Sequence, residues 1–190
     1  MDLLLTHGYF LREDEAEQAI MRPYPPLGIL YISSHLKAQG YEIEVYDTTF
    51  RLKREFRQFI DTMRPSIVGI YVNLMTKLNA LEQIAYCKQK GHRVIVGGPD
   101  VPQYADEYLR FGADIAVIGE GEATMSELLP AMISGSRLNR VAGIVFRDES
   151  GSIVRTEPRP LIQDLDSIPQ PDREAINMED YIGMWRKHHG

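Results

Sequence analysis

Five short apolar runs, each followed by a stretch with apolar residues at helical spacing, dominate the first 134 residues of this chain. The runs expected as strands cover 3–6, 41–47, 66–72, 93–96 and 114–118, and the helices 29–39, 51–63, 78–90, 104–111 and 125–133. The run at 66–72 is nearly all apolar, which is typical of a strand covered on both faces. Repeated strand–helix units predict an α/β fold with a doubly wound, parallel, five-stranded sheet.

The spacing of these units fits the flavodoxin-like, or Rossmann-like, strand order, with right-handed crossovers. Pro130 falls inside the last helical stripe and is expected to kink or shorten that helix, because proline removes a backbone hydrogen bond. Residues 141–148 and 152–156 flank Glu149-Ser150-Gly151 and predict a β-hairpin. Residues 157–172 hold four prolines and predict an extended linker.

We therefore expect three parts: an α/β domain over 1–138, a hairpin extension over 139–157, and a linker over 158–190 that leads to a further domain. The residues from Lys187 to Gly190 are expected to form a frayed tail, with Trp185 docking on that further domain.

Composition limits the classes of function. The net charge is −6 and no basic face emerges, which argues against a nucleic-acid partner. No run approaches 18 apolar residues, so no membrane span and no membrane partner are expected. Cys87 is the single cysteine, so no internal disulfide can form and a cytoplasmic location is the simple expectation. One cysteine also cannot hold an iron–sulfur cluster.

The loops at the carboxyl ends of the expected strands are the candidate site, because ligands of open α/β sheets bind there. These loops cover 7–9, 47–49, 73–76, 97–100 and 119–122, and small residues and glycines dominate them. Gly97 and Gly98 allow backbone N–H groups to face a ligand without obstruction. Such loops suit a large polar cofactor better than acid–base chemistry, although the same glycines are also typical of simple tight turns.

Two familiar nucleotide motifs are absent. A dinucleotide site needs Gly-x-Gly-x-x-Gly after the first strand, where only Gly8 occurs, and Gly119-x-Gly121 lacks the third glycine. No Gly-x-x-x-x-Gly-Lys-Ser/Thr sequence is present, which excludes a P-loop. A response regulator would place an acceptor aspartate after the third strand, where Asn73 stands.

Four segments together resemble the N-terminal cobalamin-binding domain of cobalamin-dependent radical-SAM enzymes, of which methyltransferases are the most familiar members. They are Pro-Pro-Leu-Gly-Ile-Leu-Tyr-Ile-Ser-Ser-His-Leu-Lys at 25–37, Val-Gly-Gly-Pro-Asp at 96–100, Gly-Glu-Gly-Glu at 119–122, and a proline- and aspartate-rich stretch at 158–169. The resemblance covers roughly residues 1 to 176. It implies a module that binds cobalamin and leads into a radical-SAM barrel, in an enzyme that transfers a methyl group to an unreactive carbon.

The resemblance also implies site residues. The loop lining the channel for the nucleotide tail of cobalamin would be Asn73, Leu74, Met75 and Thr76. The tail would run along Gly97 and Gly98, with Pro99 and Asp100 beside it and Gly119, Glu120 and Gly121 on its other side. The residues facing the corrin ring would be His7, Gly8, Pro26, Leu27 and Gly28. A Gly98→Trp change is expected to block this channel and leave the sheet folded.

Two departures from the wider pattern have consequences. No Asp-x-His occurs, and Leu5 stands where an aspartate would orient His7, so no protein histidine is expected on cobalt and no residue is expected to bind a metal directly. The Cys-x-x-x-Cys-x-x-Cys of the family is also absent, so the 4Fe-4S cluster and S-adenosylmethionine are expected only in a full-length enzyme, and no catalytic residue is expected here. The alternatives are a cobalamin carrier or sensor without catalysis and a flavodoxin-like domain that binds FMN or a nucleotide.

Overall fold

The computed structural model describes residues 1–190 and contains one seven-stranded sheet in the order β2-β1-β3-β4-β5-β6-β7. The first five strands are parallel, and their order, 2-1-3-4-5, is the flavodoxin-like order expected from the sequence. The strands are β1 (Leu3–His7), β2 (Ile43–Tyr46), β3 (Ile67–Tyr71), β4 (Arg93–Gly97), β5 (Ile115–Val117), β6 (Ile144–Arg147) and β7 (Ile153–Arg155).

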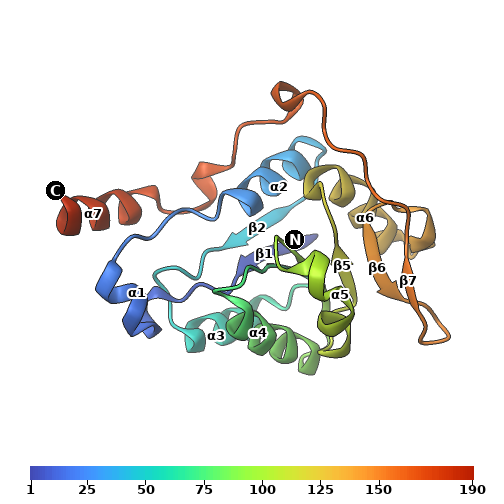
Figure 1. Ribbon diagram of the computed structural model, residues 1–190, viewed down its shortest axis with the longest axis horizontal. Helices are drawn as coiled ribbons and strands as arrows, with labels where there is room; N and C mark the ends of the chain where they lie inside the picture. The colour runs from blue at the N-terminus through green and yellow to red at the C-terminus, as the bar shows by residue number, and fades with distance from the viewer.

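Helices cover both faces of the sheet (Figure 1). Helices α2 (Leu27–Ala38) and α6 (Gly121–Ser134) lie on one face, and α3 (Lys53–Met63), α4 (Lys77–Gln89) and α5 (Val101–Arg110) lie on the other. Successive strand residues alternate between the two cores. Leu4 and Val68 pack toward α3–α5, whereas Leu5 and Ile67 pack toward α2 and α6. This burial on both faces explains the apolar strands.

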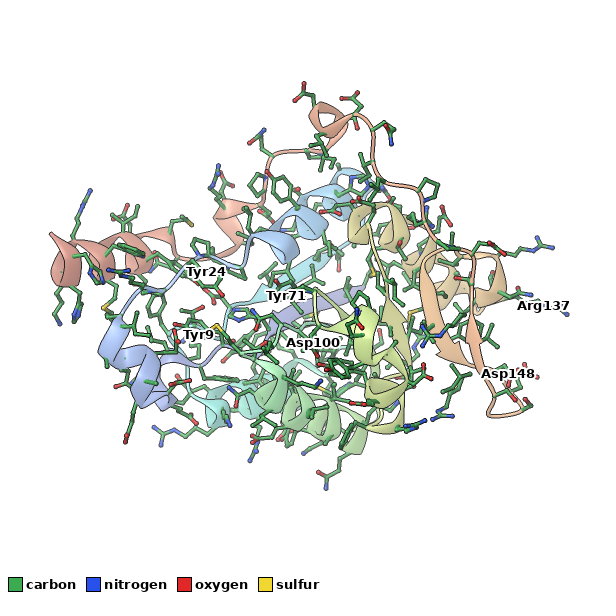
Figure 2. The ribbon with its side chains drawn as sticks, viewed as in Figure 1. Tyr9, Tyr24, Tyr71, Asp100, Arg137 and Asp148 are labelled. Carbon is green, nitrogen blue, oxygen red and sulfur yellow. The ribbon has the colours of Figure 1, made fainter.

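The hairpin is confirmed, and it extends the main sheet. Strands β6 and β7 are antiparallel, and Val145 of β6 pairs with Ala116 of β5. At the hairpin tip the Asp148 carboxylate accepts hydrogen bonds from the N–H groups of Ser150 and Ser152, and Gly151 has a φ of +82° (Figure 2). The sheet therefore has seven strands, because the hairpin pairs with the edge that β5 leaves open.

Helix α6 does not end at Pro130, although the sequence predicted that this proline would kink or shorten it. The helix runs through this proline to Ser134 and ends at Gly135, which has a φ of +69°. Leu128, Leu129 and Met132 around the proline are all buried. Their burial outweighs the hydrogen bond that proline removes, so the expectation of a shortened helix is wrong.

The C-terminal segment folds back onto the domain. After the two short 3-10 helices Leu165–Ser167 and Arg173–Ala175, helix α7 (Met178–His189) lies beside the connection between β1 and α2 (Figure 1). That connection holds the 3-10 helix Leu11–Glu13 and helix α1 (Glu15–Ile20), and a further 3-10 helix, Leu138–Arg140, follows α6. The Trp185 indole N–H donates to the carbonyl of Pro23 over 2.7 Å, and His189 Nε2 lies 2.9 Å from the carbonyl oxygen of Met21. The expectation of a frayed tail is wrong, and Trp185 docks within this chain.

No helix in the structure combines the length and the apolar character needed to pass through a lipid bilayer.

Candidate functional site

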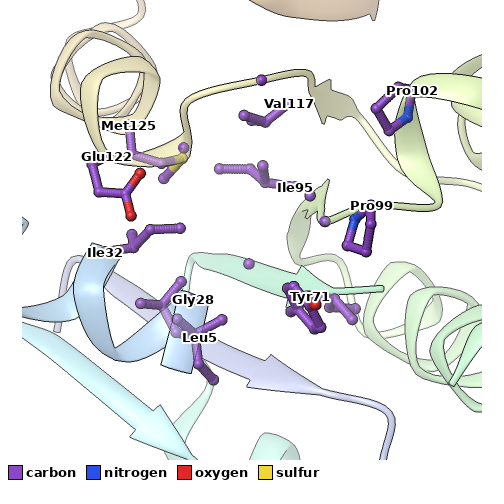
Figure 3. Close-up of a pocket in the computed structure, with 17 residues that line it drawn as sticks. Leu5, Gly28, Ile32, Tyr71, Ile95, Pro99, Pro102, Val117, Glu122 and Met125 are labelled. Atoms are coloured by element: carbon purple, nitrogen blue, oxygen red, sulfur yellow. The ribbon is translucent and has the colours of Figure 1, made fainter. Parts of the chain in front are cut away.

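A cavity of about 330 Å³ opens at the carboxyl ends of β3, β4 and β5, between α2 and α6 (Figure 3). This volume lies at the lower end of the range of about 300–1,000 Å³ that is typical of small-molecule sites. The lining residues are Leu5, Gly69, Ile70, Tyr71, Ile95, Gly97 and Val117 from the strands, Gly98, Pro99 and Gly119 from the loops, Pro102 from α5, and Gly28, Ile29, Ile32, Gly121, Glu122 and Met125 from α2 and α6.

Glycines keep this cavity open, because they have no side chains to fill it. A Cβ atom placed on Gly97 would approach Val117 to 3.8 Å, and one on Gly28 would approach the Tyr71 ring to 3.7 Å, which are ordinary contacts. Both positions could therefore carry a side chain, and glycine leaves that volume free instead. In the middle of β3, the Leu5 side chain lies across Gly69, where a Cβ would come within 2.9 Å of it.

Gly98 has a different role, because its backbone conformation requires glycine. Its φ is +116°, and a Cβ atom there would lie 2.3 Å from the carbonyl oxygen of Val72. A tryptophan at this position would displace the backbone at the end of β3. Because this local displacement would accompany any blocking of the channel by Gly98→Trp, Gly97 is the better position at which to fill the cavity.

The chemistry of the lining is apolar. Aliphatic side chains, prolines and glycines form most of it, and its polar side chains are the Tyr71 phenol and the Glu122 carboxylate. No pair of carboxylates and no nucleophile beside a base faces the cavity. No group of three or more His, Cys, Asp or Glu residues in the chain is arranged to hold a metal ion. The cavity is therefore suited to binding an apolar or weakly polar group and holds no pair of groups arranged for acid–base catalysis.

Six of the residues expected from the sequence line this cavity: Gly28, Gly97, Gly98, Pro99, Gly119 and Gly121. Sequence reasoning missed the floor, formed by Leu5, Gly69, Tyr71, Ile95 and Val117, and the helix residues Ile32 and Met125. Glu122 lies in the candidate loop 119–122 but was not assigned to the cofactor. The missed floor residues occupy alternate positions on their strands. This alternation was readable in each strand, but the face they share is defined only by the pairing of the strands.

The 73–76 loop is closed on itself and does not line the cavity. The Asn73 side chain accepts from the Thr76 N–H over 2.9 Å, and the Thr76 hydroxyl accepts from the Asn73 N–H over 3.1 Å. This exchange fixes the turn that leads into α4. Leu74 and Met75 are 77% and 60% exposed, so they face outward from the carboxyl edge of the sheet.

Asp100 is likewise occupied within the protein. Its buried carboxylate accepts a hydrogen bond from the Tyr108 hydroxyl and pairs with the Lys77 ammonium at 3.1 Å. Burial, followed by this hydrogen bond to Asp100, raises the pKa of Tyr108. Lys77 also lies over the Tyr104 ring, 3.4 Å from its centroid. Asp100 therefore ties α4 to α5, on the face of the sheet opposite the cavity.

His7 belongs to a closed polar network at the ends of β1 and β2. The Tyr9 N–H donates to His7 Nδ1, which leaves Nε2–H to donate to Asp47 over 2.9 Å. The Tyr181 hydroxyl of α7 donates to the other oxygen of Asp47 over 2.7 Å. The same Tyr181 hydroxyl lies 2.8 Å from the Thr49 hydroxyl. The expectation that His7 lacks an orienting carboxylate is wrong, because Asp47 supplies one from a neighbouring strand.

Burial opposes ionisation of Asp47, but the hydrogen bonds from His7, the Thr49 N–H and Tyr181 outweigh it and lower the pKa of Asp47 to about 2. Because both His7 nitrogens and both Asp47 oxygens already have partners, this network offers a ligand no free group.

The remaining expected residues lie outside the cavity lining. A Cβ on Gly8 would meet the Thr76 carbonyl oxygen at 2.9 Å, so Gly8 is a close-packing position against α4. Pro26 and the half-exposed Leu27 begin α2 beside Gly28. Glu120 precedes the first turn of α6, and its carbonyl accepts from the Thr124 N–H.

A family model described as "B12 binding domain" matches residues 20–129, which include every residue that lines the cavity except Leu5 of β1. The chain belongs to the B12-binding domain family.

Curated relatives are larger proteins. The chain is 31% identical to an uncharacterized methyltransferase of Pyrococcus horikoshii, over 83% of this chain and 35% of that protein. It is 29% identical to an anaerobic magnesium-protoporphyrin IX monomethyl ester cyclase of Rubrivivax gelatinosus, over 84% of this chain and 30% of that protein. This B12-binding domain therefore spans about a third of the length of the curated relatives it matches.

Solved structures share the fold. The cobalamin-dependent S-adenosylmethionine radical enzyme OxsB with aqua-cobalamin bound superposes with a TM-score of 0.72 at 21% identity, over 97% of this chain and 25% of that one. The radical S-adenosylmethionine methyltransferase TsrM of Kitasatospora setae, with cobalamin and a [4Fe-4S] cluster bound, gives 0.66 at 24% identity, over 89% of this chain and 30% of that one. The B12-binding domain thus shares its fold with part of each of these two larger cobalamin-bound enzymes.

The residues of the cavity fit the base of the nucleotide end of cobalamin, a flat, uncharged dimethylbenzimidazole joined to a ribose that in turn carries the charged phosphate. Glycines at Gly28 and Gly97 leave the volume that side chains would fill, and apolar residues such as Ile95 and Met125 form the walls. Such a lining favours an aromatic ring over a charged ligand, because burying an unpaired charge is costly.

Proposed function

We propose that this B12-binding domain holds cobalamin with its nucleotide end in the cavity between α2 and α6 and its corrin ring over the carboxyl ends of the strands. The observation that supports this most strongly is the cavity itself: it lies in the part of the chain that matches the family model, and glycines keep it open. Pro26, Leu27, Leu74 and Met75, which lie outside the cavity, are proposed to contact the corrin ring.

The larger protein is proposed to be a cobalamin-dependent radical-SAM methyltransferase that acts on an unactivated carbon. Proteins named as uncharacterized methyltransferases are among the relatives, and this chain covers 35% of the length of one and 26% of another. The 4Fe-4S cluster and S-adenosylmethionine would be held by residues outside this chain, in a barrel that follows it, because Cys87 is buried and alone. Burial raises the pKa of the Cys87 thiol to about 12, and an unreactive single cysteine agrees with a cytoplasmic protein.

Bound cobalamin would supply the methyl-carrying chemistry of cobalt, and the residues of this chain would bind and orient it. The apolar walls would exclude water from the inserted ring. His7 would stay off the cobalt, since Asp47 and the Tyr9 N–H hold its imidazole. This part of the protein would therefore leave one face of the cobalt free of protein ligands.

Filling the cavity tests the proposal directly. In Gly97→Leu the new side chain would occupy the cavity, since a Cβ there meets no atom closer than 3.8 Å. The matched control is Gly183→Leu, because Gly183 lies in α7 and a Cβ added there would have no atom within 4 Å. Each protein is mixed with hydroxocobalamin or with FMN and desalted, and its visible spectrum is recorded.

We expect the wild-type protein and the control to retain corrinoid, and Gly97→Leu to bind it at least tenfold more weakly with an unchanged melting temperature. Retention of flavin without corrinoid would contradict the proposal in favour of a flavodoxin-like function. Equal corrinoid retention by Gly97→Leu would show that the nucleotide end lies elsewhere.

A further inference from the structure

Glu122 is the one charged side chain that lines the cavity. It is the second residue of α6 and is partly buried, and its carboxylate lies between α6 and Ile32 of α2 (Figure 3). The two helices approach closely at this end of the cavity, because a Cβ on Gly121 would lie 3.0 Å from the Ile32 side chain. A carboxylate thus stands at the edge of an otherwise apolar and glycine-lined space.

The protein supplies no partner for this carboxylate. Two other carboxylates near this edge are paired: Asp47 accepts from His7 and Tyr181, and Asp100 accepts from Tyr108 and pairs with Lys77. Glu120 does not line the cavity. The Glu122 carboxylate makes no hydrogen bond and no ion pair in the structure; only its backbone carbonyl is bonded, to the Ser126 hydroxyl. A ligand that displaces water beside it must therefore bring a hydrogen-bond donor.

We propose that Glu122 sets the specificity for the nucleotide end of the corrinoid, by accepting a hydrogen bond from an O–H or N–H donor at that end. This inference rests on the proposed function. The dimethylbenzimidazole base of cobalamin carries no such donor. The donor in cobalamin would therefore be a free hydroxyl of the ribose. In corrinoids whose lower base is adenine, the exocyclic amino group is a second source. Carboxylates accept hydrogen bonds from ribose hydroxyls in other α/β cofactor sites, which makes this pairing chemically ordinary.

Three variants test the proposed hydrogen bond between Glu122 and the nucleotide end of the corrinoid. Glu122→Leu removes the acceptor, and Glu122→Gln keeps an uncharged one. The matched control is Glu179→Leu, because Glu179 is the second residue of α7, is exposed, and lies outside the cavity. Dissociation constants are measured by equilibrium dialysis for hydroxocobalamin, for the adenine-containing cobamide and for cobinamide, which lacks the nucleotide, and each variant's melting temperature is recorded.

We expect Glu122→Leu to weaken binding of a nucleotide-bearing corrinoid about tenfold, as the loss of one charge-assisted hydrogen bond would. Cobinamide affinity should change less than twofold, Glu122→Gln should lose less than Glu122→Leu, and Glu179→Leu should lose nothing. Equal losses for hydroxocobalamin and the adenine cobamide would identify a ribose hydroxyl as the donor. A loss confined to the adenine cobamide, or larger for it, would identify the base.

Two results would overturn the inference, and they are distinguishable. If wild-type protein prefers hydroxocobalamin to cobinamide but Glu122→Leu weakens all three ligands equally, or none, Glu122 does not contact the nucleotide end, and the proposed function stands. If wild-type protein binds cobinamide as tightly as hydroxocobalamin, the nucleotide end does not enter the cavity, and the proposed function fails together with this inference.

Discussion

The carboxyl edge of the sheet has two corners, both of which the sequence marks as candidate site loops, and the two differ in structure. At the ends of β1 and β2, polar residues form a closed network in which His7, Asp47, Thr49 and Tyr181 satisfy one another. At the ends of β3, β4 and β5, glycines and apolar residues surround a cavity of about 330 Å³. The first corner contains more polar chemistry, yet the second has the space for a ligand.

The difference shows that polar residues at strand ends do not by themselves make a binding site. Asn73, Thr76 and Asp100 also bear hydrogen-bonding side chains, but Asn73 and Thr76 bond to each other and Asp100 bonds to Tyr108 of α5. What marks the open corner is the combination of missing side chains and an unpartnered carboxylate, Glu122, in the lining of the cavity. The comparison can be tested by closing the open corner and by loosening the closed one.

The largest effect is expected from Gly98→Ala, at the boundary of the open corner. The added methyl would meet the Val72 carbonyl oxygen at 2.3 Å, and φ is +116°. Steric overlap and the unfavourable backbone together predict a loss of roughly 3 kcal/mol or more in the free energy of unfolding, measured by urea denaturation.

Gly91→Ala provides the control for this loss. Gly91 also has a positive φ, +84°, but nothing lies within 4 Å of its added Cβ. Its cost should be about 1 kcal/mol, from the backbone alone. Equal losses in the two variants would mean that the β3 backbone moves aside easily and that Gly98 is not a close-packing position.

Low pH is expected to destabilise the polar network around Asp47 at the ends of β1 and β2. Because hydrogen bonds hold the pKa of Asp47 at about 2, below its ordinary 3.8, the ionised group stabilises the folded state above about pH 4. This stabilisation, roughly 2 kcal/mol, should disappear as the pH falls from about 4 to about 2. Unfolding of wild-type protein and Asp47→Asn by urea across this range measures it.

The stability difference between the two proteins should be largest near neutral pH and close to zero near pH 2. Tyr181→Phe, which removes one donor to Asp47, should give a smaller difference with the same pH dependence. A difference that does not change with pH would show that the network contributes by packing and not by holding a charge.

Local patterns predicted most of the fold, whereas contacts between distant residues escaped prediction. The five parallel strands followed from apolar runs, and the hairpin followed from Gly151 and its flanking strands. The docking of α7 could not be read, because Tyr181 and Asp47 are 134 residues apart and neither alone indicates the other. The pairing of Asn73 with Thr76 was readable, since it joins residues three positions apart.

For the candidate site, the sequence identified glycines but not what surrounds them. Gly97 and Gly28 could be named from turns and motifs, whereas the floor residues Leu5, Ile95 and Val117 become neighbours only through strand register. For Glu122, the sequence leaves open an acid pair with Glu120 or a carboxylate that stabilises the start of α6. Its lack of a partner inside a cavity is a property of the fold.

The smallest effect is expected from Gly28→Ala, which tests whether this glycine serves only the helix or also leaves space for the ligand. Gly28 lies in α2, and a methyl group there would touch the Tyr71 ring at 3.7 Å, which is an ordinary contact. Gly28→Ala should therefore raise the free energy of unfolding by roughly 0.5–1 kcal/mol, because alanine favours a helix, and should weaken cobalamin binding severalfold, because the methyl takes space from the ligand. Gly183→Ala in α7 should give the same gain in stability with unchanged binding. A Gly28→Ala protein that gains stability and binds cobalamin as tightly as wild type would mean that this glycine serves only the helix, and that the volume beside it is not where the ligand lies.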